Sequence, residues 1–426
     1  YQSKSFLTIP MLNNEDRVIG VLQLLNAKDL SSGETVAFRE DQQRIVEALA
    51  SQAAIALENQ QLLEGQKRLL ESFIKLIAAA IDAKSPYTGA HCERVPVLTE
   101  LLAKAACESE EGALADFNLS DEEWYELRIA AWLHDCGKVV TPVHVMDKAT
   151  KLETISDRVA TVEARFEVLK KDVEISFLRK LLESPENEEA LRAEFEEELK
   201  QLNDELEFIQ YVNVGGEFLP PEKQQRIREI ASRPYSGAGN SKTVLTDDEV
   251  HNLSISRGTL TRDERLIINN HMVQTIKMLN ALPFPENLRR VPEYAGGHHE
   301  KMDGTGYPKG IYAGDMSVPA RLMAIADVFE ALTAQDRPYK KGKTLSESMR
   351  IMGFMKKDNH LDPVLFDLFV QSGVYKDYAA RYLPDELIDE VDEEALLIIE
   401  PRPFKLPQTA ERMMRWADFL PEYLDK

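Results

Sequence analysis

The stretch AAWLHDCGKVV, residues 130–140, is the most informative part of this sequence. An apolar helical run leads directly into His134 and Asp135. An ionised aspartate among apolar residues is costly unless it is paired or coordinates a metal. A second apolar run, RLMAIADVFEAL at residues 321–332, places Asp327 in the same situation. Together they point to a divalent-metal site, since imidazole and carboxylate ligands suit iron, manganese and zinc.

Four further histidines are candidate metal ligands. His298 and His299 follow two glycines and begin the stretch HHEKMDGTGYP, residues 298–308. Paired histidines at a loop or at a helix start can converge on one ion. His91 lies in YTGAHCERV, and His271 lies in RLIINNHM. We expect structural or surface roles for the remaining three, which are His144, His251 and His360.

These motifs, in this order, resemble a known family. HDCGK at residues 134–138 is similar to the HDxGK signature of the HD-superfamily metal phosphohydrolases. HHEKMDGTGYP is similar to the HHExxDGxGYP signature of the HD-GYP subfamily. The resemblance covers residues 85–148 and 259–375 and implies a mainly α, HD-type helical bundle. Family members are phosphodiesterases that hydrolyse cyclic dinucleotides, chiefly cyclic di-GMP to pGpG or GMP, in bacterial signalling.

The resemblance also implies a ligand set. One metal would be held by His91, His134, Asp135 and Asp327. A second metal, bridged to the first by Asp135, would be held by His271, His298 and His299. Two such ions lower the pKa of a bridging water and bind the phosphate that is attacked. The bridging hydroxide would then attack phosphorus in line with the leaving 3′ oxygen.

The number and identity of the ions are expected from the same resemblance. Some family members bind a third metal through a carboxylate four residues before the first histidine. Tyr87 stands at that position here, so we expect a two-metal site. Iron or manganese is the expected ion, while zinc, nickel and cobalt also fit such ligands.

Lys138 completes the HDxGK motif, and we expect it to act with Asp135 in catalysis. It lies four residues after His134, so an α-helix would place both on one face. Its ammonium group would then neutralise a non-bridging phosphate oxygen.

Further substrate contacts are expected from the stretch DRPYKKGK, residues 336–343. In the family, the arginine and the first lysine hold substrate phosphates, which implies these roles for Arg337 and Lys340. Arginine suits bidentate phosphate contacts, and lysine acts as a point charge. The GYP loop would border the active site, with Tyr307 touching substrate, and would contact diguanylate cyclase (GGDEF) partners. It consists of Gly306, Tyr307 and Pro308.

The N-terminal part predicts two strands, at residues 5–12 and 17–27, followed by a long helix from residue 37 to residue 84. This order resembles the C-terminal half of a GAF sensor domain, carried by IGVLQLLNAKD and QAAIALENQQLL. We therefore expect a partial α+β GAF-like segment at residues 1–64 and a connector helix at residues 65–84.

So long a helix rarely stands alone, and residues 40–80 are expected to form a parallel coiled coil in a homodimer. The chain starts at Tyr1, in what reads as the middle of a domain. We therefore expect a fragment of a longer protein, which a membrane segment upstream could tether.

Residues 149–258 look inserted into the helical domain. Two amphipathic stripes, the first of which begins at Ile155, lie on either side of Pro185 within residues 151–210 and predict an antiparallel helical hairpin. Residues 211–258 are rich in glycine and proline and are expected to be mostly loops. The insert is expected to be a surface protrusion or dimerisation arm, with a role in substrate contact as the alternative. Residues 376–426 are expected to form an acidic extension, in which residues 385–400, with eight acidic and no basic side chains, are expected to be a solvated face.

Composition limits the partners. Among 426 residues, 51 are basic and 73 are acidic, which gives a net charge of −22. This balance argues against binding long nucleic acids or membrane surfaces, whereas a small anionic substrate needs only local positive charge. Three cysteines without a CxxC pair fit a reducing cytoplasm. No run of 18 apolar residues predicts a membrane span in this chain.

The sequence leaves two alternatives to a cyclic di-GMP phosphodiesterase. The substrate could be another cyclic dinucleotide, such as cyclic GMP-AMP, because metal ligands do not distinguish the bases. A non-catalytic signalling scaffold could instead bind partners through the GYP loop, the insert or the coiled coil.

Overall fold

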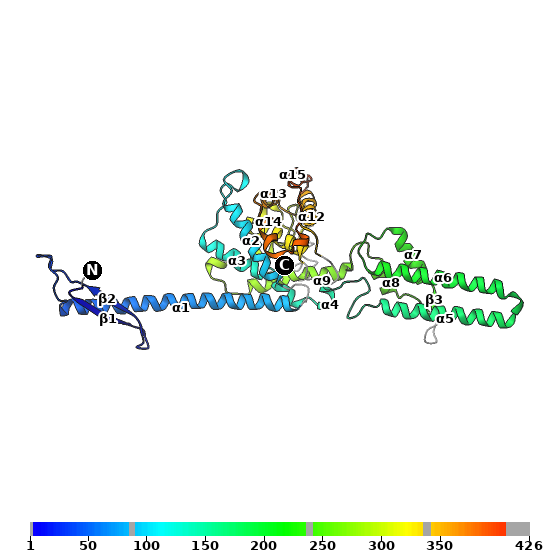
Figure 1. Cartoon of the computed structure of the whole chain (residues 1–426), viewed down its shortest axis with the longest axis horizontal. Coiled ribbons are helices and arrows are strands. Elements are labelled where there is room, and N and C mark those ends of the chain that lie inside the picture. The colour runs from blue at the N-terminus through cyan, green and yellow to red at the C-terminus, as the bar shows by residue number, and fades with distance from the viewer. Residues whose placement is uncertain (1–2, 85–89, 236–241, 335–341, 406–426) are drawn as a thin grey trace, which may run out of the picture. The chain divides into compact units, whose positions relative to one another are not determined.

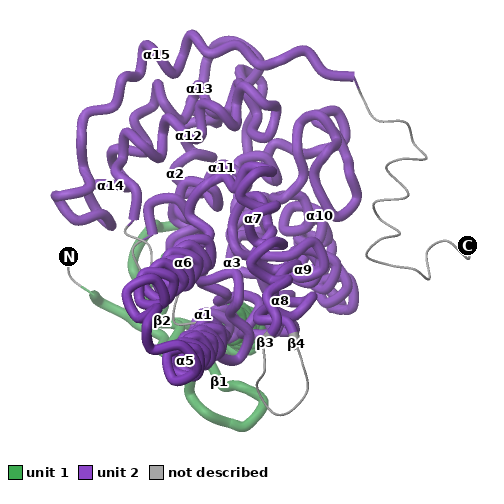
Figure 2. The backbone as a smooth tube through the Cα atoms, turned by 90° about the vertical axis from the view of Figure 1, so that its right-hand side faces the viewer, with its two compact units in different colours: residues 1–76 green, residues 77–426 purple. Residues whose placement is uncertain are grey.

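The computed structural model describes residues 3–84, 90–235, 242–334 and 342–405. These residues are mainly α-helical, and their strands form two small two-stranded sheets, which confirms the predicted fold class. The chain divides into two compact units, Tyr1–Leu76 and Ile77–Lys426 (Figure 2).

The first unit combines a β-hairpin with the start of a long helix. Strands β1 (Phe6–Leu12) and β2 (Val18–Leu25) pair antiparallel and are followed by helix α1 (Glu40–Lys84). Alternate side chains of a strand point to one face, so one side of the hairpin can cover the helix. Ile9 of β1 and Val46 of α1 meet in this core. Both strands and the long helix agree with the prediction.

The second unit contains a bundle whose helices carry most of the conspicuous histidines and aspartates. Helix α11 packs against α2, and α9 packs against the 3-10 turn η2. A capping box starts α3, in which Ser120 and Glu123 satisfy each other's backbone N–H groups. The bundle elements are α2 (His91–Cys107), α3 (Asp121–Leu133), η2 (Cys136–Val140), α4 (Val143–Met146), α9 (Arg262–Asn280), α10 (Val291–Gly296) and α11 (Val318–Thr333).

The C-terminal helices of the described part pack on this bundle. They are α12 (Leu345–Lys357), α13 (Pro363–Gln371), α14 (Val374–Tyr382) and α15 (Glu393–Leu397). Leu396 is buried, and Lys356 donates a hydrogen bond to its carbonyl oxygen at 3.4 Å. The acidic side chains of this segment are mostly exposed, in agreement with the expected solvated face, and Leu396 packs on the bundle from its other side.

The predicted helical hairpin is present. Helices α5 (Val159–Glu183) and α6 (Glu188–Asn213) lie side by side, and the rings of Phe177 and Phe195 stack at 4.8 Å between them (Figure 1). Ile155, assigned to the first apolar stripe, lies before α5 and is 94% exposed, so the stripe begins later than predicted.

The rest of the insert is more regular than expected. Helices α7 (Pro221–Ala231) and α8 (Asp247–Leu253) and the short strands β3 (Pro234–Tyr235) and β4 (Lys242–Thr243) occupy the segment predicted as loops. Proline is favourable at the first position of a helix, where no backbone N–H is needed, so Pro221 starts α7 rather than breaking it. Leu219, Ile227, Val244 and Leu253 join α5 and α6 in a separate apolar core.

Within the described ranges, no helix combines the length and the apolarity that a membrane crossing requires.

Candidate metal centre

The structure brings together all seven residues of the two expected ligand sets. His91 is the first residue of α2, and His134 and Asp135 directly follow α3. His271 lies in α9 and Asp327 in α11. His298 and His299 lie in a turn after the end of α10, which agrees with a loop rather than with a helix start.

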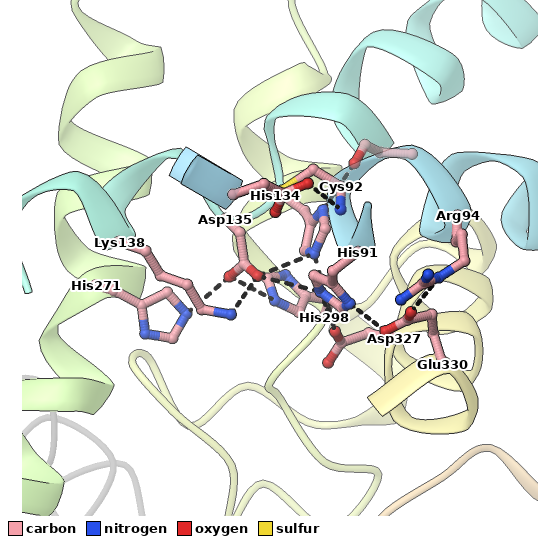
Figure 3. A network of polar contacts seen from close by, with 12 residues as sticks. His91, Cys92, Arg94, His134, Asp135, Lys138, His271, His298, Asp327 and Glu330 are labelled. Carbon is pink, nitrogen blue, oxygen red and sulfur yellow. Dashed lines mark hydrogen bonds and ion pairs between the residues drawn. The ribbon is translucent and has the colours of Figure 1, made fainter. Parts of the chain in front are cut away.

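Asp135 is the centre of the arrangement. Its Oδ2 lies 3.4 Å from Nε2 of His91 and 3.2 Å from Nε2 of His134. Its Oδ1 lies 3.2 Å from Nε2 of His271 and 4.0 Å from Nε2 of His298. The two oxygens of one carboxylate thus face two different pairs of histidines (Figure 3).

Asp327 adds a second carboxylate on one side of Asp135. Its Oδ1 lies 3.3 Å from Nε2 of His91 and 3.9 Å from Nε2 of His134. Two clusters result, and in each the candidate ligand atoms lie within 4.8 Å of one another. Cluster 1 consists of His91, His134, Asp135 and Asp327, and cluster 2 consists of Asp135, His271, His298 and His299. Both clusters could hold a metal ion.

The imidazole nitrogens facing these carboxylates support that fit. Among the described residues, nothing hydrogen-bonds the buried Nε2 atoms of His91, His134, His271 and His298. Buried polar atoms are rarely left unpaired, because their desolvation is not repaid. A divalent cation between the Nε2 atoms and the carboxylates would satisfy both at once.

Backbone carbonyl groups orient three of these rings. Nδ1 of His134 donates to Ala131 at 2.7 Å, and Nδ1 of His298 donates to Ala295 at 2.7 Å. His271 has the equivalent contact at 2.6 Å, to the carbonyl oxygen of Ile268. A proton on Nδ1 leaves the lone pair of Nε2 available to a metal, which is how proteins orient histidine ligands.

The ionisation states of His298 and Asp135 suit metal ligands. Burial and the neighbouring His134 lower the pKa of His298 to about 4, so this imidazole is neutral at physiological pH. Burial opposes the charge of Asp135, but Lys138 and His134 hold the pKa of its carboxyl well below its usual range. Neutral imidazoles and ionised carboxylates are the forms that bind metals.

Lys138 reaches the site by a different route from the one expected. Helix α3 ends at Leu133, and Lys138 lies on the 3-10 turn η2, so it does not share an α-helical face with His134. The tighter turn nevertheless directs its ammonium group to Oδ2 of Asp135, at 2.5 Å.

A glycine allows this turn to pack against α9. The backbone N–H of Gly137 donates to the hydroxyl oxygen of Thr275 at 2.9 Å. A Cβ atom at position 137 would lie 2.0 Å from the carbonyl oxygen of His271. Any side chain would therefore push η2 away from the helix that carries His271.

The GYP loop borders cluster 2. The ring of Tyr307 stacks on that of His299, with centroids 4.8 Å apart and 20° between the planes. A Cβ atom at Gly306 would lie 2.4 Å from the backbone nitrogen of Lys301, so the loop crosses its own chain closely. Buried Glu300 holds the loop by accepting the backbone N–H of Lys309 at 2.8 Å.

Three residues singled out from the sequence lie outside the described residues. They are Tyr87, Arg337 and Lys340.

Sequence reasoning missed Glu330. This buried carboxylate contacts Nδ1 of His91 and accepts a hydrogen bond from Nε of Arg94 at 2.6 Å (Figure 3). Burial favours a neutral imidazole, but Glu330, Asp135 and Asp327 together raise the pKa of His91 well above its usual range. The spacing could have revealed the role, because Glu330 follows Asp327 by three residues and therefore shares its helix face.

The helical bundle thus brings together, around one shared carboxylate, two histidine–aspartate clusters that could each hold a metal ion. Comparison with known families adds two domain matches. Residues 243–365 match the HD domain, and residues 1–57 match the GAF domain. The chain thus carries sequence similar to both domains, each over less than a third of its length. The HD match begins at residue 243, within the last part of the insert, so His91, His134 and Asp135 lie outside the matched residues.

Curated relatives carry the same kind of domain. The chain is 40% identical over 115 residues, 27% of its length and 26% of the relative's, to a 3′3′-cGAMP-specific phosphodiesterase of Vibrio cholerae. It is 38% identical over 119 residues, 28% of each chain, to a cyclic di-GMP phosphodiesterase of Pseudomonas aeruginosa. A longer match, 24% identical over 319 residues, covers 74% of this chain and 40% of another V. cholerae 3′3′-cGAMP-specific phosphodiesterase. The chain thus spans well under half the length of these relatives.

Proposed function

We propose that this protein is a metal-dependent phosphodiesterase that hydrolyses cyclic di-GMP to pGpG, GMP or both, in bacterial second-messenger signalling. The observation that carries the proposal is the pair of clusters sharing Asp135, with four buried Nε2 atoms aimed at two carboxylates. The names of the relatives, which include cyclic di-GMP phosphodiesterases, support the substrate class.

The residues of this chain have distinct parts in that reaction. His91, His134, Asp135 and Asp327 would hold one ion, and Asp135, His271, His298 and His299 would hold the other. Bound divalent ions supply Lewis acidity and a water of lowered pKa. Lys138, next to Asp135, is placed to neutralise charge on the phosphate, and Tyr307 offers a ring at the rim of cluster 2.

Several finer expectations belong to the same proposal. Arg337 and Lys340 would hold substrate phosphates. Iron or manganese is the proposed ion, with zinc, nickel or cobalt as substitutes, because availability selects among metals that fit such ligands. The catalytic domain would comprise residues 85–148 and 259–375, and the GYP loop would contact a diguanylate cyclase.

Metal analysis of anaerobically purified protein, coupled to hydrolysis assays with a panel of cyclic dinucleotides, tests the function. We expect close to two transition-metal ions per chain and conversion of cyclic di-GMP to linear product. A metal-loaded protein that leaves cyclic di-GMP intact would overturn the proposal.

The same panel decides between substrates. Cleavage of cyclic GMP-AMP in preference to cyclic di-GMP would support the alternative favoured by the relatives named as 3′3′-cGAMP-specific. Metal binding without any hydrolysis would favour the scaffold.

We also propose a parallel homodimer through α1. Two heptad series of apolar side chains run next to each other along this helix and are exposed: Leu62, Leu69 and Leu76, and Leu63, Leu70 and Ile77. Such spacing is the signature of a helix that packs along a second helix.

The partner whose apolar heptads match this stripe is the α1 helix of a second copy of the chain. Light scattering of the whole chain should give a dimer, and Leu62→Glu combined with Leu69→Glu should give a monomer. Gln60→Glu, outside the stripe, serves as the control. A monomeric wild type would contradict the pairing.

A further inference from the structure

The last turn of α1 belongs to the second unit and packs there. Ala78 is fully buried, and Ile81 is 5% exposed. Two charged residues follow, Asp82 and Lys84, and α1 ends at the latter. Both use their side chains to bind backbone groups of other segments, and each of those segments carries residues of the metal centre.

Asp82 holds the start of α2. Its Oδ2 accepts the backbone N–H of Cys92 at 3.2 Å, and its side chain is buried. The residue before α2 is Ala90, at φ 63°, whose methyl group cannot cap a helix. The first N–H groups of a helix need acceptors and favour a negative charge nearby. Asp82 therefore supplies from α1 a cap for the turn that begins with His91.

Lys84 holds the turn that carries Lys138. Its Nζ donates to three carbonyl oxygens, those of Lys138 at 2.9 Å, Val139 at 2.5 Å and Thr141 at 2.6 Å. An ammonium group has three N–H donors, so these contacts use its full capacity. A cation at the carbonyl end of a helical turn is also favourable electrostatically. Lys84 thereby fixes η2, which follows Asp135 directly.

One turn of α1 thus holds two segments that are far apart in the sequence. The first presents His91 and the second presents Asp135, whose side chains are 3.4 Å apart across cluster 1. The same helix begins at Glu40, beside the β-hairpin of the first unit. A displacement of its end would shift both segments, because each is held through its backbone.

We propose that Asp82 and Lys84 are positioning residues that set the geometry of the metal centre and couple it to α1. This inference rests on the proposed function, since it concerns the regulation of the same site. Neither residue belongs to the expected ligand or substrate contacts.

Four variants test the positioning role. Asp82→Ala removes the acceptor and Lys84→Met removes the donors at similar length, while Lys84→Arg keeps a donor cation. Lys171→Met, on the exposed hairpin, controls for the loss of a positive charge.

We expect Asp82→Ala and Lys84→Met to weaken Mn²⁺ binding about 10–100-fold, the range found for residues that orient metal ligands. The value of kcat should fall with KM changed less than threefold. Lys84→Arg should recover most of the affinity, and Lys171→Met should match wild type. Mn²⁺ affinity and kcat both within twofold of wild type in Asp82→Ala and Lys84→Met would overturn the proposal.

Coupling is tested in the folded wild type by hydrogen exchange. If α1 and the metal centre are linked, metal binding must act back on α1, because coupling is reciprocal. We expect Mn²⁺ to slow exchange in residues 78–84 at least fivefold, and less than twofold in Lys84→Met. An unchanged rate in wild type, or equal slowing in both proteins, would refute the coupling. These measurements use Mn²⁺ alone, so they remain decisive even if the protein hydrolyses no cyclic dinucleotide.

Discussion

The metal centre and the inserted hairpin both bury charged side chains, but they satisfy them differently. In the insert, Arg165 lies 2.6 Å from Glu249, and Arg233 meets both oxygens of Glu205 at 2.6 and 2.8 Å. In the centre, two aspartates face imidazole nitrogens that nothing in the described chain hydrogen-bonds. The insert thus pairs these charges within the polypeptide, whereas the groups of the centre could be satisfied by a cation.

Asp135→Asn should disrupt the metal centre most strongly, because Asp135 belongs to both clusters. We expect kcat for cyclic di-GMP hydrolysis to fall at least about a thousandfold, as for essential members of a catalytic group. The bound metal should also decrease, as measured by elemental analysis.

The matched control is Asp248→Asn, which removes the partner of Arg158 in the insert. We expect its activity within twofold of wild type. An active Asp135→Asn protein with a full metal complement would rule out a bridging role for Asp135.

The sequence was sufficient to predict the centre where its chemistry is contained in contiguous motifs. HDCGK and HHEKMDGTGYP carry four of the seven residues that meet, and the family resemblance added His91, His271 and Asp327. Lys138 was expected to share an α-helical face with His134, but it lies on a 3-10 turn, from which its ammonium group reaches Asp135. Helical periodicity also predicted α1, α5 and α6.

Other features could not be seen because they depend on contacts between distant segments. Nothing local in the sequence indicates that Asp82 would meet Cys92, or that Lys84 would meet three carbonyl groups after Gly137. Helices α7 and α8 are too short to show periodicity, and prolines and glycines around them favoured loops. The signals that start them were nevertheless present, in Pro221 and in the capping box of Thr246 with Glu249.

Removal of metal should destabilise the helices around the metal centre and leave the stability of the insert unchanged. An ion bound to the folded state stabilises it by about 2.7 kcal/mol at a concentration 100 times its dissociation constant. A chelator should therefore speed hydrogen exchange in α2, α9 and α11 at least tenfold. Exchange in α5 and α6 should change less than twofold. Equal acceleration in both regions would show that the insert, too, depends on the ions.

Glu330→Gln should produce a smaller effect at the centre. The carboxylate contacts Nδ1 of His91, and Arg94 supports it from the other side. Residues of this kind change metal affinity about 10–100-fold when replaced. Titration with Mn²⁺ should show that loss.

Glu205→Gln is the corresponding change in the insert, where the carboxylate meets Arg233. It should leave Mn²⁺ affinity unchanged and lower the stability of the insert. A Glu330→Gln protein with wild-type affinity would mean that packing alone orients His91.

Substitution of Lys151 should have the smallest effect and tests the insert most sharply. Lys151 is a buried cation of the insert, and both acceptors of its hydrogen bonds are carbonyl oxygens rather than carboxylates. It is 1% exposed, and its Nζ donates to the carbonyl oxygens of Leu253 at 3.0 Å and Ile255 at 2.7 Å. Burial lowers its pKa to about 8. Lysine in the unfolded chain keeps its proton up to a pKa of about 10.4.

Between pH 8 and pH 10 the unfolded state therefore binds more protons than the folded state, so this residue makes the free energy of unfolding rise with pH. The free energy of unfolding of wild type relative to Lys151→Met should rise by up to about 2 kcal/mol over that window, since one pKa unit corresponds to about 1.4 kcal/mol. Denaturant titrations followed at the hairpin measure it, with Lys171→Met as the exposed control. A difference that stays flat with pH would mean that the two carbonyl groups solvate the ammonium as well as water does. The insert would then satisfy Lys151, like Glu205 and Glu249, entirely within the polypeptide, and the contrast with the metal centre would be sharper.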